Sequence, residues 1–269
     1  MARIQFAVVF CMLAGFAIAP EQVEEAKITS LERQAGGDEN KRYFLIGPRE
    51  AEKPPEAGHG LLVVLPGGDG SADFRPFVER ILKRAAPEGY VVAQPVAVKW
   101  TEDQRIVWPT QNNPVPEQQF STEEFIKSVI EDVNTVLPVD ERRVFCMGWS
   151  SSGPALYAAA LVEEPIAGGF YIAMSVFKPR LLPPLERAEG RLFYIEHSPD
   201  DRVCPYRMAL DAKKRLGEAG AIVEFSTYEG GHGWRGDVYG RIRRAIRWFE
   251  TRTSDDKGGG DQPAPPDEP

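Results

Sequence analysis

Long basic runs, cysteine and histidine are all scarce in this sequence, and each shortage excludes a class of protein. The 269 residues carry a formal net charge of −8 and include only 3 cysteines and 3 histidines. A nucleic-acid-binding domain normally presents a strongly basic face, so this acidic balance argues against a nucleic-acid partner. The basic stretch "RIRRAIRW" near residue 244 is predicted to be the solvated side of a helix. Three cysteines do not make a disulfide framework, and a Cys146–Cys204 bridge is left open.

The two ends of the chain differ in composition from its middle. Residues 1–19 combine an early Arg, a long apolar run and small residues, which is typical of a secretory signal peptide. We therefore expect an exported protein, periplasmic or secreted; the alternative is an uncleaved N-terminal membrane anchor. Residues 20–40 are predicted to be a loose polar leader, and residues 253–269 a disordered Gly/Pro/acidic tail that buries too little apolar surface to fold. One folded domain is expected over residues 41–252.

Strand and helix patterns alternate between these ends. The predicted strands cover residues 42–47, 60–66, 89–98, 142–148, 168–176, 191–198 and 221–230. The predicted helices cover residues 74–86, 121–137, 153–164, 205–220 and 237–252. This alternation predicts an α/β fold with a mostly parallel central sheet and helices on both faces. Ligands of such sheets bind at the carboxyl ends of the strands, so functional residues should directly follow strands.

Three consecutive serines follow the predicted strand 142–148 and precede a helix. A serine at such a strand–turn–helix junction is the nucleophile elbow, G-x-S-x-G, whose turn requires small residues two positions before and two after the serine. Ser150 has Gly148 and Ser152 at these positions, whereas the other two serines place a tryptophan or a proline there. Ser150 is therefore the candidate nucleophile, and Ser152 is a departure from the pattern.

A carboxylate and a histidine follow later strands in the order that this elbow requires. A serine hydroxyl needs a base within hydrogen-bond reach, and the base needs an orienting acid. Asp200 and Asp201 follow strand 191–198, and His232 lies in "EGGHGW" after strand 221–230. Since the chain order is serine, acid, histidine, the three strand ends together predict a triad.

The other histidines are poorer candidates for the base. His197 shares a loop with the candidate acid and is badly placed to bridge from it to Ser150, while His59 precedes its strand and belongs to the opposite end of the sheet. No metal is expected, because a metal site would combine ligands without a recognised spacing, namely His197, Asp200, Asp201 and Cys204.

The glycine-rich stretch "LPGGDGSADF" after strand 60–66 is the candidate for half of an oxyanion hole. Such a hole needs two backbone N–H groups aimed at the oxygen that gains charge. We predict Ser151 as the first donor and Gly68 as the second, with Asp69 as the alternative. A phosphate-binding loop is discounted, because no Lys and Ser/Thr pair follows at the required spacing.

The stretches "VVLPGGDGSADF", "FCMGWSSSGPALY", "DDRVCPY" and "YEGGHGW" resemble α/β-hydrolase-fold serine esterases over about residues 42 to 252. The resemblance is to the small phospholipase/carboxylesterase type and to the polyhydroxybutyrate-depolymerase and feruloyl-esterase type. It implies that Asp201, four residues before Pro205, is the acid. It also implies an open site without a large lid, since the stretch 177–190 is short. Pro66 stands where these families usually carry His.

The resemblance implies a serine hydrolase that cleaves a small-molecule carboxylic ester by two-step acyl transfer and needs no cofactor. Ser150 would be the nucleophile, His232 the base and Asp201 its orienting acid. Contacts with substrate are predicted for Asp69, Trp108, Trp149 and Trp234; the alternative for the tryptophans of loop 98–116 is that they pack that loop down. A serine peptidase of the prolyl-oligopeptidase type and a non-enzymatic cell-envelope protein on a hydrolase scaffold are the alternatives. The natural ester and the oligomeric state stay open.

Overall fold

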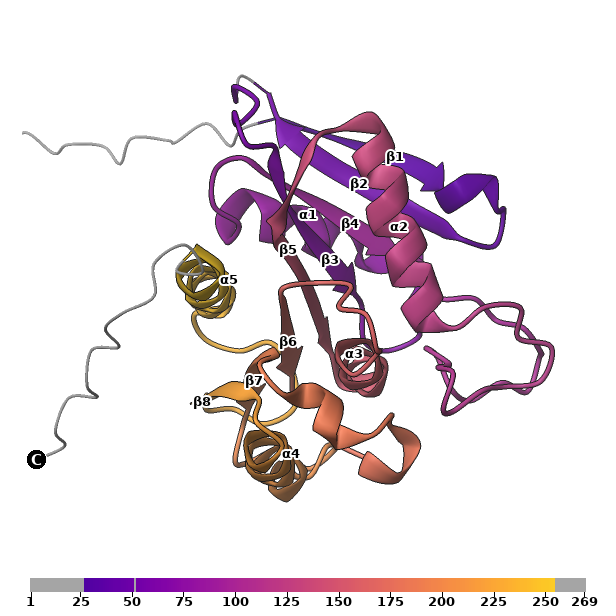
Figure 1. Cartoon of the computed structure of the whole chain (residues 1–269), viewed down its shortest axis with the longest axis vertical. Helices are drawn as coiled ribbons and strands as arrows, with labels where there is room; N and C mark the ends of the chain where they lie inside the picture. The colour runs from indigo at the N-terminus through magenta and orange to yellow at the C-terminus, as the bar shows by residue number, and fades with distance from the viewer. Residues whose placement is uncertain (1–26, 51, 255–269) are drawn as a thin grey trace, which may run out of the picture.

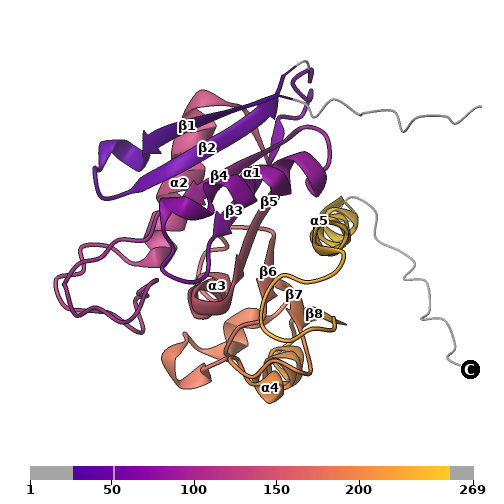
Figure 2. The same cartoon turned by 180° about the vertical axis from the view of Figure 1, so that it is seen from behind.

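The computed structural model describes residues 27–50 and 52–254, which form one eight-stranded sheet covered by helices on both faces (Figures 1 and 2). The predicted signal or anchor segment 1–19, residues 20–26 of the predicted leader and residues 255–269 of the predicted tail lie outside the described residues. The tail, predicted from residue 253, is wrong for Thr253 and Ser254, which end the last helix. Within the described ranges, no helix combines the length and the apolar character that crossing a membrane requires.

The sheet has the order β1-β2-β4-β3-β5-β6-β7-β8. Its strands are β1 (Ile28–Gln34), β2 (Arg42–Arg49), β3 (His59–Leu65), β4 (Tyr90–Pro95), β5 (Val139–Trp149), β6 (Gly169–Ala173), β7 (Leu192–His197) and β8 (Ile222–Thr227). β1 and β2 pair antiparallel, β2 joins β4 antiparallel, and all pairs from β4 to β8 are parallel. The prediction of a mostly parallel sheet is confirmed, and the parallel strands bring their carboxyl ends to one edge.

Five α-helices cover the two faces of this sheet. They are α1 (Arg75–Arg84), α2 (Thr122–Val136), α3 (Gly153–Ala160), α4 (Tyr206–Glu218) and α5 (Val238–Ser254). The apolar residues of α1 and α5 pack on one face, and those of α2, α3 and α4 pack on the other. The segment between β6 and β7 holds only two short 3-10 helices, η4 (Pro179–Leu181) and η5 (Leu185–Ala188), which confirms that the described chain has no large lid.

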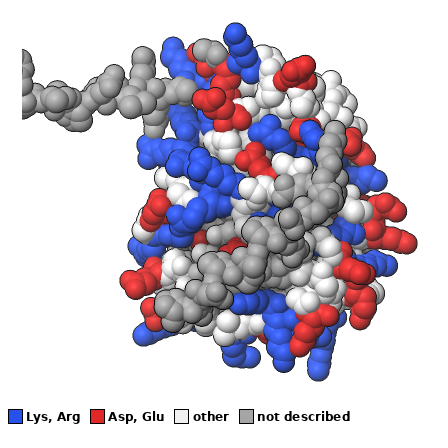
Figure 3. All heavy atoms as spheres, turned by 60° about the vertical axis from the view of Figure 1, so that its left-hand side comes forward, with Lys and Arg blue, Asp and Glu red and all other residues white. Residues whose placement is uncertain are grey.

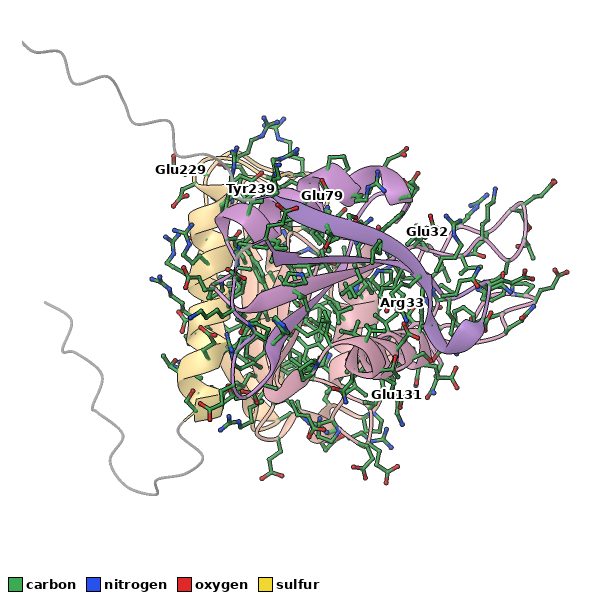
Figure 4. All side chains as sticks on the ribbon, turned by 90° about the horizontal axis from the view of Figure 1, so that it is seen from above. Glu32, Arg33, Glu79, Glu131, Glu229 and Tyr239 are labelled. Carbon is green, nitrogen blue, oxygen red and sulfur yellow. The ribbon has the colours of Figure 1, made fainter. Side chains whose placement is uncertain are left out.

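The prediction of a loose leader over residues 20–40 is wrong for residues 28–37. These residues form the edge strand β1 and the 3-10 helix η1 (Ala35–Gly37). Arg33 and Tyr43 both bond to one carboxylate oxygen of Asp132 on α2, at 2.8 and 2.6 Å, which ties β1 and β2 to that helix. Figure 4 shows Arg33 on this edge of the molecule. Polar side chains suit an edge strand that faces solvent, so the polarity of this stretch concealed a strand.

The basic stretch of α5 is mostly solvated, as predicted, but one of its arginines is not. Arg243, Arg244 and Arg247 are exposed, whereas Arg241 is only 6% exposed. Basic side chains accordingly gather on the side of the molecule that carries α1 and α5, with acidic ones among them (Figure 3). Arg241 points instead into the packed layer between α5 and the sheet, and its role there belongs to the site described below.

The close approach of α5 to the sheet gives a stability prediction. A Cβ added at Gly169 in β6 would lie 2.4 Å from the Phe249 ring, whereas one added at Gly217 in α4 meets nothing within 4 Å. Gly169→Ala should lower the free energy of unfolding by about 1–3 kcal/mol through overpacking. Gly217→Ala, the matched control, should raise it by about 0.5–1 kcal/mol. Urea unfolding of both variants tests this packing, and equal effects would contradict it.

Candidate active site

The serine turn joins β5 to α3 in a conformation that a side chain adopts only under constraint. Ser150 has a φ of +56°, in the left-handed region that non-glycine residues rarely enter. Gly148, two residues earlier, is obligatory, because a Cβ there would lie 2.5 Å from the Ser152 hydroxyl oxygen. The short 3-10 helix η3 (Ser150–Ser152) then leads into α3. The turn holds Ser150 at its apex, as the elbow pattern predicts.

Ser152, which replaces the second glycine of the elbow pattern, braces the turn. Its Oγ donates to the Leu65 carbonyl at the end of β3, at 2.8 Å, and accepts from the Trp149 N–H at 2.9 Å. The side chain is fully buried. The departure from the pattern therefore adds a hydrogen-bonded link between the ends of two neighbouring strands instead of weakening the turn.

The structure brings Ser150, His232 and Asp201 into one hydrogen-bonded chain. Ser150 Oγ lies 3.0 Å from His232 Nε2, and His232 Nδ1 lies 2.8 Å from Asp201 Oδ2. Since a carboxylate only accepts, Nδ1 carries the proton, and Nε2 is left to accept the serine hydroxyl. This is the arrangement in which an imidazole removes a proton from a serine.

The carboxylate that bonds to His232 belongs to Asp201 and not to its neighbour Asp200. Asp201 is buried, and its Oδ1 accepts the N–H groups of Val203 and Cys204, both at 2.8 Å. Burial acts to raise the pKa of Asp201, but the hydrogen bonds from His232 and these two N–H groups outweigh it and hold the pKa below its usual value. Asp201 is therefore an ionised carboxylate that accepts the N–H of His232.

The two other histidines make different contacts. His197 is buried, with Nε2 2.8 Å from the Cys204 carbonyl oxygen and 3.3 Å from Asp201 Oδ2. His59 lies at the amino end of β3, where its Nδ1 is 3.3 Å from the Gly89 carbonyl. Of the three histidines, the structure places only His232 against the Ser150 hydroxyl.

The loop that carries His232 is held at Gly231, the residue before the histidine. Gly231 N–H donates to Ser198 Oγ, and the Gly231 carbonyl accepts the Tyr228 hydroxyl, both at 3.0 Å. Ser198 follows β7 directly, so this bond joins the histidine loop to the loop of the acid. These contacts position the loop, which its glycines would otherwise leave flexible.

A buried ion pair secures the far side of the same loop. Arg241 Nε donates to Glu196 Oε1 at 3.0 Å, and Nη1 donates to the Arg235 carbonyl at 2.6 Å. Burial raises the pKa of Glu196, and the Arg241 charge opposes this. Sequence reasoning missed both residues. The signal was the helical period of α5, which places Arg241 on the same face as the apolar residues Ala245 and Phe249.

The predicted oxyanion donors lie against each other. Ser151 Oγ donates to the Gly68 carbonyl at 2.8 Å, which joins the serine turn to the glycine-rich loop. Gly68 has a φ of +62°, and a Cβ at Gly67 would lie 2.6 Å from the Trp149 ring, so this loop depends on glycine. The Ser151 N–H belongs to the first turn of η3, where N–H groups lack an intrahelical acceptor.

The predicted substrate-contacting residues divide into buried and surface groups. Trp108 and Trp149 are 4% and 5% exposed; Trp108 donates to the Pro66 carbonyl at 2.9 Å, and Trp149 packs edge-on against Phe74. Both indoles therefore pack against the loops around the site and support them. Trp234, after the histidine, packs on Trp149 at a ring distance of 5.6 Å and is partly exposed.

Asp69 lines a pocket of about 250 Å³ next to the glycine-rich loop. A hydrogen bond from Ser71 lowers the pKa of the Asp69 carboxyl. The remaining walls of the pocket come from the segment after β4, namely Ala97, Val98, Lys99, Gln104, Ile106 and Val107. The pocket is mostly apolar, with a few polar groups at its edge.

The two described cysteines are not bridged, and three potential metal ligands lie close together at the site. Cys146 and Cys204 are both free and buried, and burial raises the pKa of the Cys204 thiol to about 11. Ligand atoms of Asp201, Cys204 and His232 lie within 4.8 Å of one another. The Asp201 oxygens already accept two backbone N–H groups and the His232 N–H.

Comparison with solved structures identifies the architecture. The structure of Thermogutta terrifontis esterase 2 phosphorylated by paraoxon superposes with a TM-score of 0.59 at 17% identity, covering 86% of this chain and 96% of that one. MGS-M1, an alpha/beta hydrolase enzyme from a Medee basin deep-sea metagenome library, gives 0.59 at 12% identity, covering 86% and 100%. The Bacillus cereus carboxylesterase gives 0.56 at 13% identity, covering 78% and 93%. The chain has the α/β-hydrolase fold. No family model and no curated protein matches the sequence.

The α/β-hydrolase fold places the three side chains after β5, β7 and β8, as the sequence predicts. The Glu196–Arg241 pair gives a test of what holds the histidine loop there. Arg241→Met should lower the free energy of unfolding by about 3–5 kcal/mol, because it leaves a buried carboxylate unpaired. Adding Glu196→Gln to it should restore part of the loss. Urea unfolding measures both effects.

Arg244 on the same helix is the matched control for this test. It is exposed and lies 3.8 Å from Asp237. Arg244→Met should change the free energy of unfolding by about 0.5 kcal/mol or less. Similar losses for Arg241→Met and Arg244→Met would show that the buried pair has no special role.

Proposed function

We propose that the protein is a serine hydrolase that cleaves carboxylic esters through an acyl-enzyme. The observation that carries the proposal is the contact of Ser150 Oγ with His232 Nε2 at 3.0 Å, with His232 Nδ1 held by Asp201 at 2.8 Å. A serine hydroxyl is a weak nucleophile until such a base removes its proton. A serine in a strained elbow, a base and a buried acid on three separate loops have no evident structural purpose.

The proposed reaction has two steps. His232 accepts the Ser150 proton as the oxygen attacks the ester carbonyl, and then gives that proton to the departing alcohol. Water, deprotonated by His232, then attacks the acyl-serine; the bond between the acyl carbon and Ser150 Oγ breaks, His232 returns the proton to that oxygen, and the acid leaves. Asp201 stays ionised throughout and stabilises the imidazolium, a role that suits its lowered pKa. All bond changes occur between substrate, water, Ser150 and His232.

The carbonyl oxygen gains negative charge in both steps and needs fixed donors. We assign this role to the backbone N–H groups of Ser151 and Gly68, whose loops are joined by the Ser151 hydroxyl. One donor of this kind contributes about 3 kcal/mol to the transition state. The pocket beside Asp69 is the proposed place for part of the substrate. Its volume of about 250 Å³ suits a small ester better than a polymer chain.

The structural neighbours support an esterase over a peptidase. Two of the reported neighbours carry the names esterase and carboxylesterase, and the Thermogutta enzyme is phosphorylated by paraoxon. The described residues form a single α/β domain, without the large extra domain expected of a prolyl-oligopeptidase-type enzyme. We also propose export, which is supported by the composition of residues 1–19.

The decisive variants are the two adjacent serines. Ser150→Ala should reduce turnover of p-nitrophenyl acetate by at least about 10³-fold and abolish labelling by a fluorophosphonate probe, with the melting temperature nearly unchanged. Ser151→Ala, the matched control, loses only a hydroxyl bond to Gly68 and should keep measurable turnover and labelling. An inactive Ser151→Ala beside an active Ser150→Ala would reject the assignment.

The substrate class is tested by comparing esters with amides. We expect turnover of short-chain p-nitrophenyl esters and little turnover of peptide nitroanilides, with rates that fall as the acyl chain outgrows the pocket. A panel of acyl lengths, with feruloyl and acetyl-sugar esters, measures this preference. Faster cleavage of the nitroanilides would replace the esterase proposal with a peptidase.

A further inference from the structure

His197 is a second imidazole close to Asp201, the proposed acid of the triad. Its Nε2 lies 2.8 Å from the Cys204 carbonyl oxygen and 3.3 Å from Asp201 Oδ2, the same oxygen that accepts from His232. The side chains of His197 and Asp201 are 1% and 0% exposed. At such burial the imidazole and the carboxylate act on each other at short range in a medium of low dielectric constant.

The contacts fix the tautomer of His197. A backbone carbonyl can only accept, so the Nε2 atom that lies 2.8 Å from the Cys204 oxygen must carry a proton. The N–H therefore points at the Cys204 carbonyl, and its positive end lies beside Asp201 Oδ2, which is 3.3 Å from Nε2. Burial lowers the pKa of His197, which keeps the ring neutral near pH 7 and leaves the N–H dipole, without a full charge, beside the acid.

His197 also closes the turn that holds Asp201. Asp201 Oδ1 accepts the N–H groups of Val203 and Cys204, and the Cys204 carbonyl in turn accepts from His197. Hydrogen bonds thus link Asp201 to the turn that follows it, and that turn to the imidazole at the end of β7. Removing the imidazole leaves the Cys204 carbonyl without this donor and takes the N–H away from the neighbourhood of Asp201 Oδ2.

We propose that His197 is a positioning residue that tunes the Asp201–His232 pair, an inference that rests on the proposed esterase function. Its N–H stabilises the negative charge of Asp201 and so weakens the hold of that carboxylate on a proton at His232. Without this N–H, Asp201 would stabilise protonated His232 more strongly. The free base, which the reaction needs, would then form only at higher pH.

Other titratable groups surround the ring and remain unchanged in the test. They are Asp201 and His232 in the triad, Cys204 in the turn, Tyr206 on α4 at a ring distance of 5.9 Å, and Lys178, whose charge acts on the Cys204 thiol. A change at residue 197 alters the N–H beside Asp201 Oδ2 while leaving all of these groups in the chain.

The test compares His197→Leu with His197→Gln. A glutamine amide N–H can occupy the place of imidazole Nε2, whereas leucine has no donor. For His197→Leu we expect kcat to fall roughly tenfold with little change in KM, and the acid limb of the kcat/KM profile to move up by roughly half to one pH unit. His197→Gln should keep the wild-type limb. Should His197→Leu fail to fold, His197→Asn, whose amide is too short to reach Cys204, replaces it.

His59→Leu is the matched control. His59 is also buried and bonded to a carbonyl, but it lies at the opposite end of the sheet. Its loss should lower the melting temperature without moving the acid limb. An unmoved limb in His197→Leu, or an equal movement in His59→Leu, would overturn the inference while leaving the esterase proposal intact.

A spectroscopic measurement separates this inference from the proposed function. The proton between His232 Nδ1 and Asp201 gives a downfield resonance whose position reports the strength of that bond. It should shift in His197→Leu and stay in place in His197→Gln and His59→Leu. An absence of ester turnover in the wild-type protein would reject the proposed function, and this resonance would still decide the role of His197.

Discussion

The hydrogen bond between His232 and Asp201 is the interaction on which the rest of the site depends. It joins the loops that follow two neighbouring parallel strands, β7 and β8, and it fixes which nitrogen of His232 faces Ser150. Both loops contain residues that suit many backbone conformations. The bond between His232 and Asp201 therefore forms only if other contacts hold each loop in place. Ser198 connects them through Gly231, and the backbone N–H groups after Asp201 fix the carboxylate. The site is therefore assembled from loops but made rigid by contacts to strand ends.

The serine turn, on the other side of the site, is also held by contacts to strand ends. A φ of +56° at Ser150 carries an energetic cost of order 1–3 kcal/mol. Ser152 offsets it, because its buried hydroxyl bonds to the ends of β3 and β5 at once. A glycine at this position would relieve crowding but would contribute no such bond. Ser152 therefore stabilises the tight turn by hydrogen bonds, where the elbow pattern would relieve its crowding with a glycine.

The fold, and the meeting of Ser150, His232 and Asp201 at one edge of the sheet, could be predicted from sequence because both depend on order along the chain. Buried parallel strands appear as continuous apolar runs, and the polar residues directly after them fall at one edge of the sheet. The edge strand β1 escaped this reasoning because it faces solvent, with Leu31 59% exposed, and so lacks an apolar run. The packing of Trp108 and Trp149 could not be predicted either. The sequence shows that a tryptophan lies near the site, but it does not distinguish one that lines a pocket from one that packs beneath a loop. Glu196 and Arg241 lie 45 residues apart, and no local pattern joins them.

The end of β7 explains why these hidden residues matter. Successive side chains of a strand point to opposite faces of the sheet, so Glu196 and His197 separate there. Glu196 turns toward α5, where Arg241 holds the backbone of the histidine loop. His197 turns toward α4 and contacts Asp201 and the Cys204 carbonyl. One pair of adjacent residues therefore supports the His232 loop from one face and Asp201 from the other. A displacement of this strand end would disturb both partners together, which makes the last two residues of β7 the point where the packing of the sheet and the chemistry of the site meet.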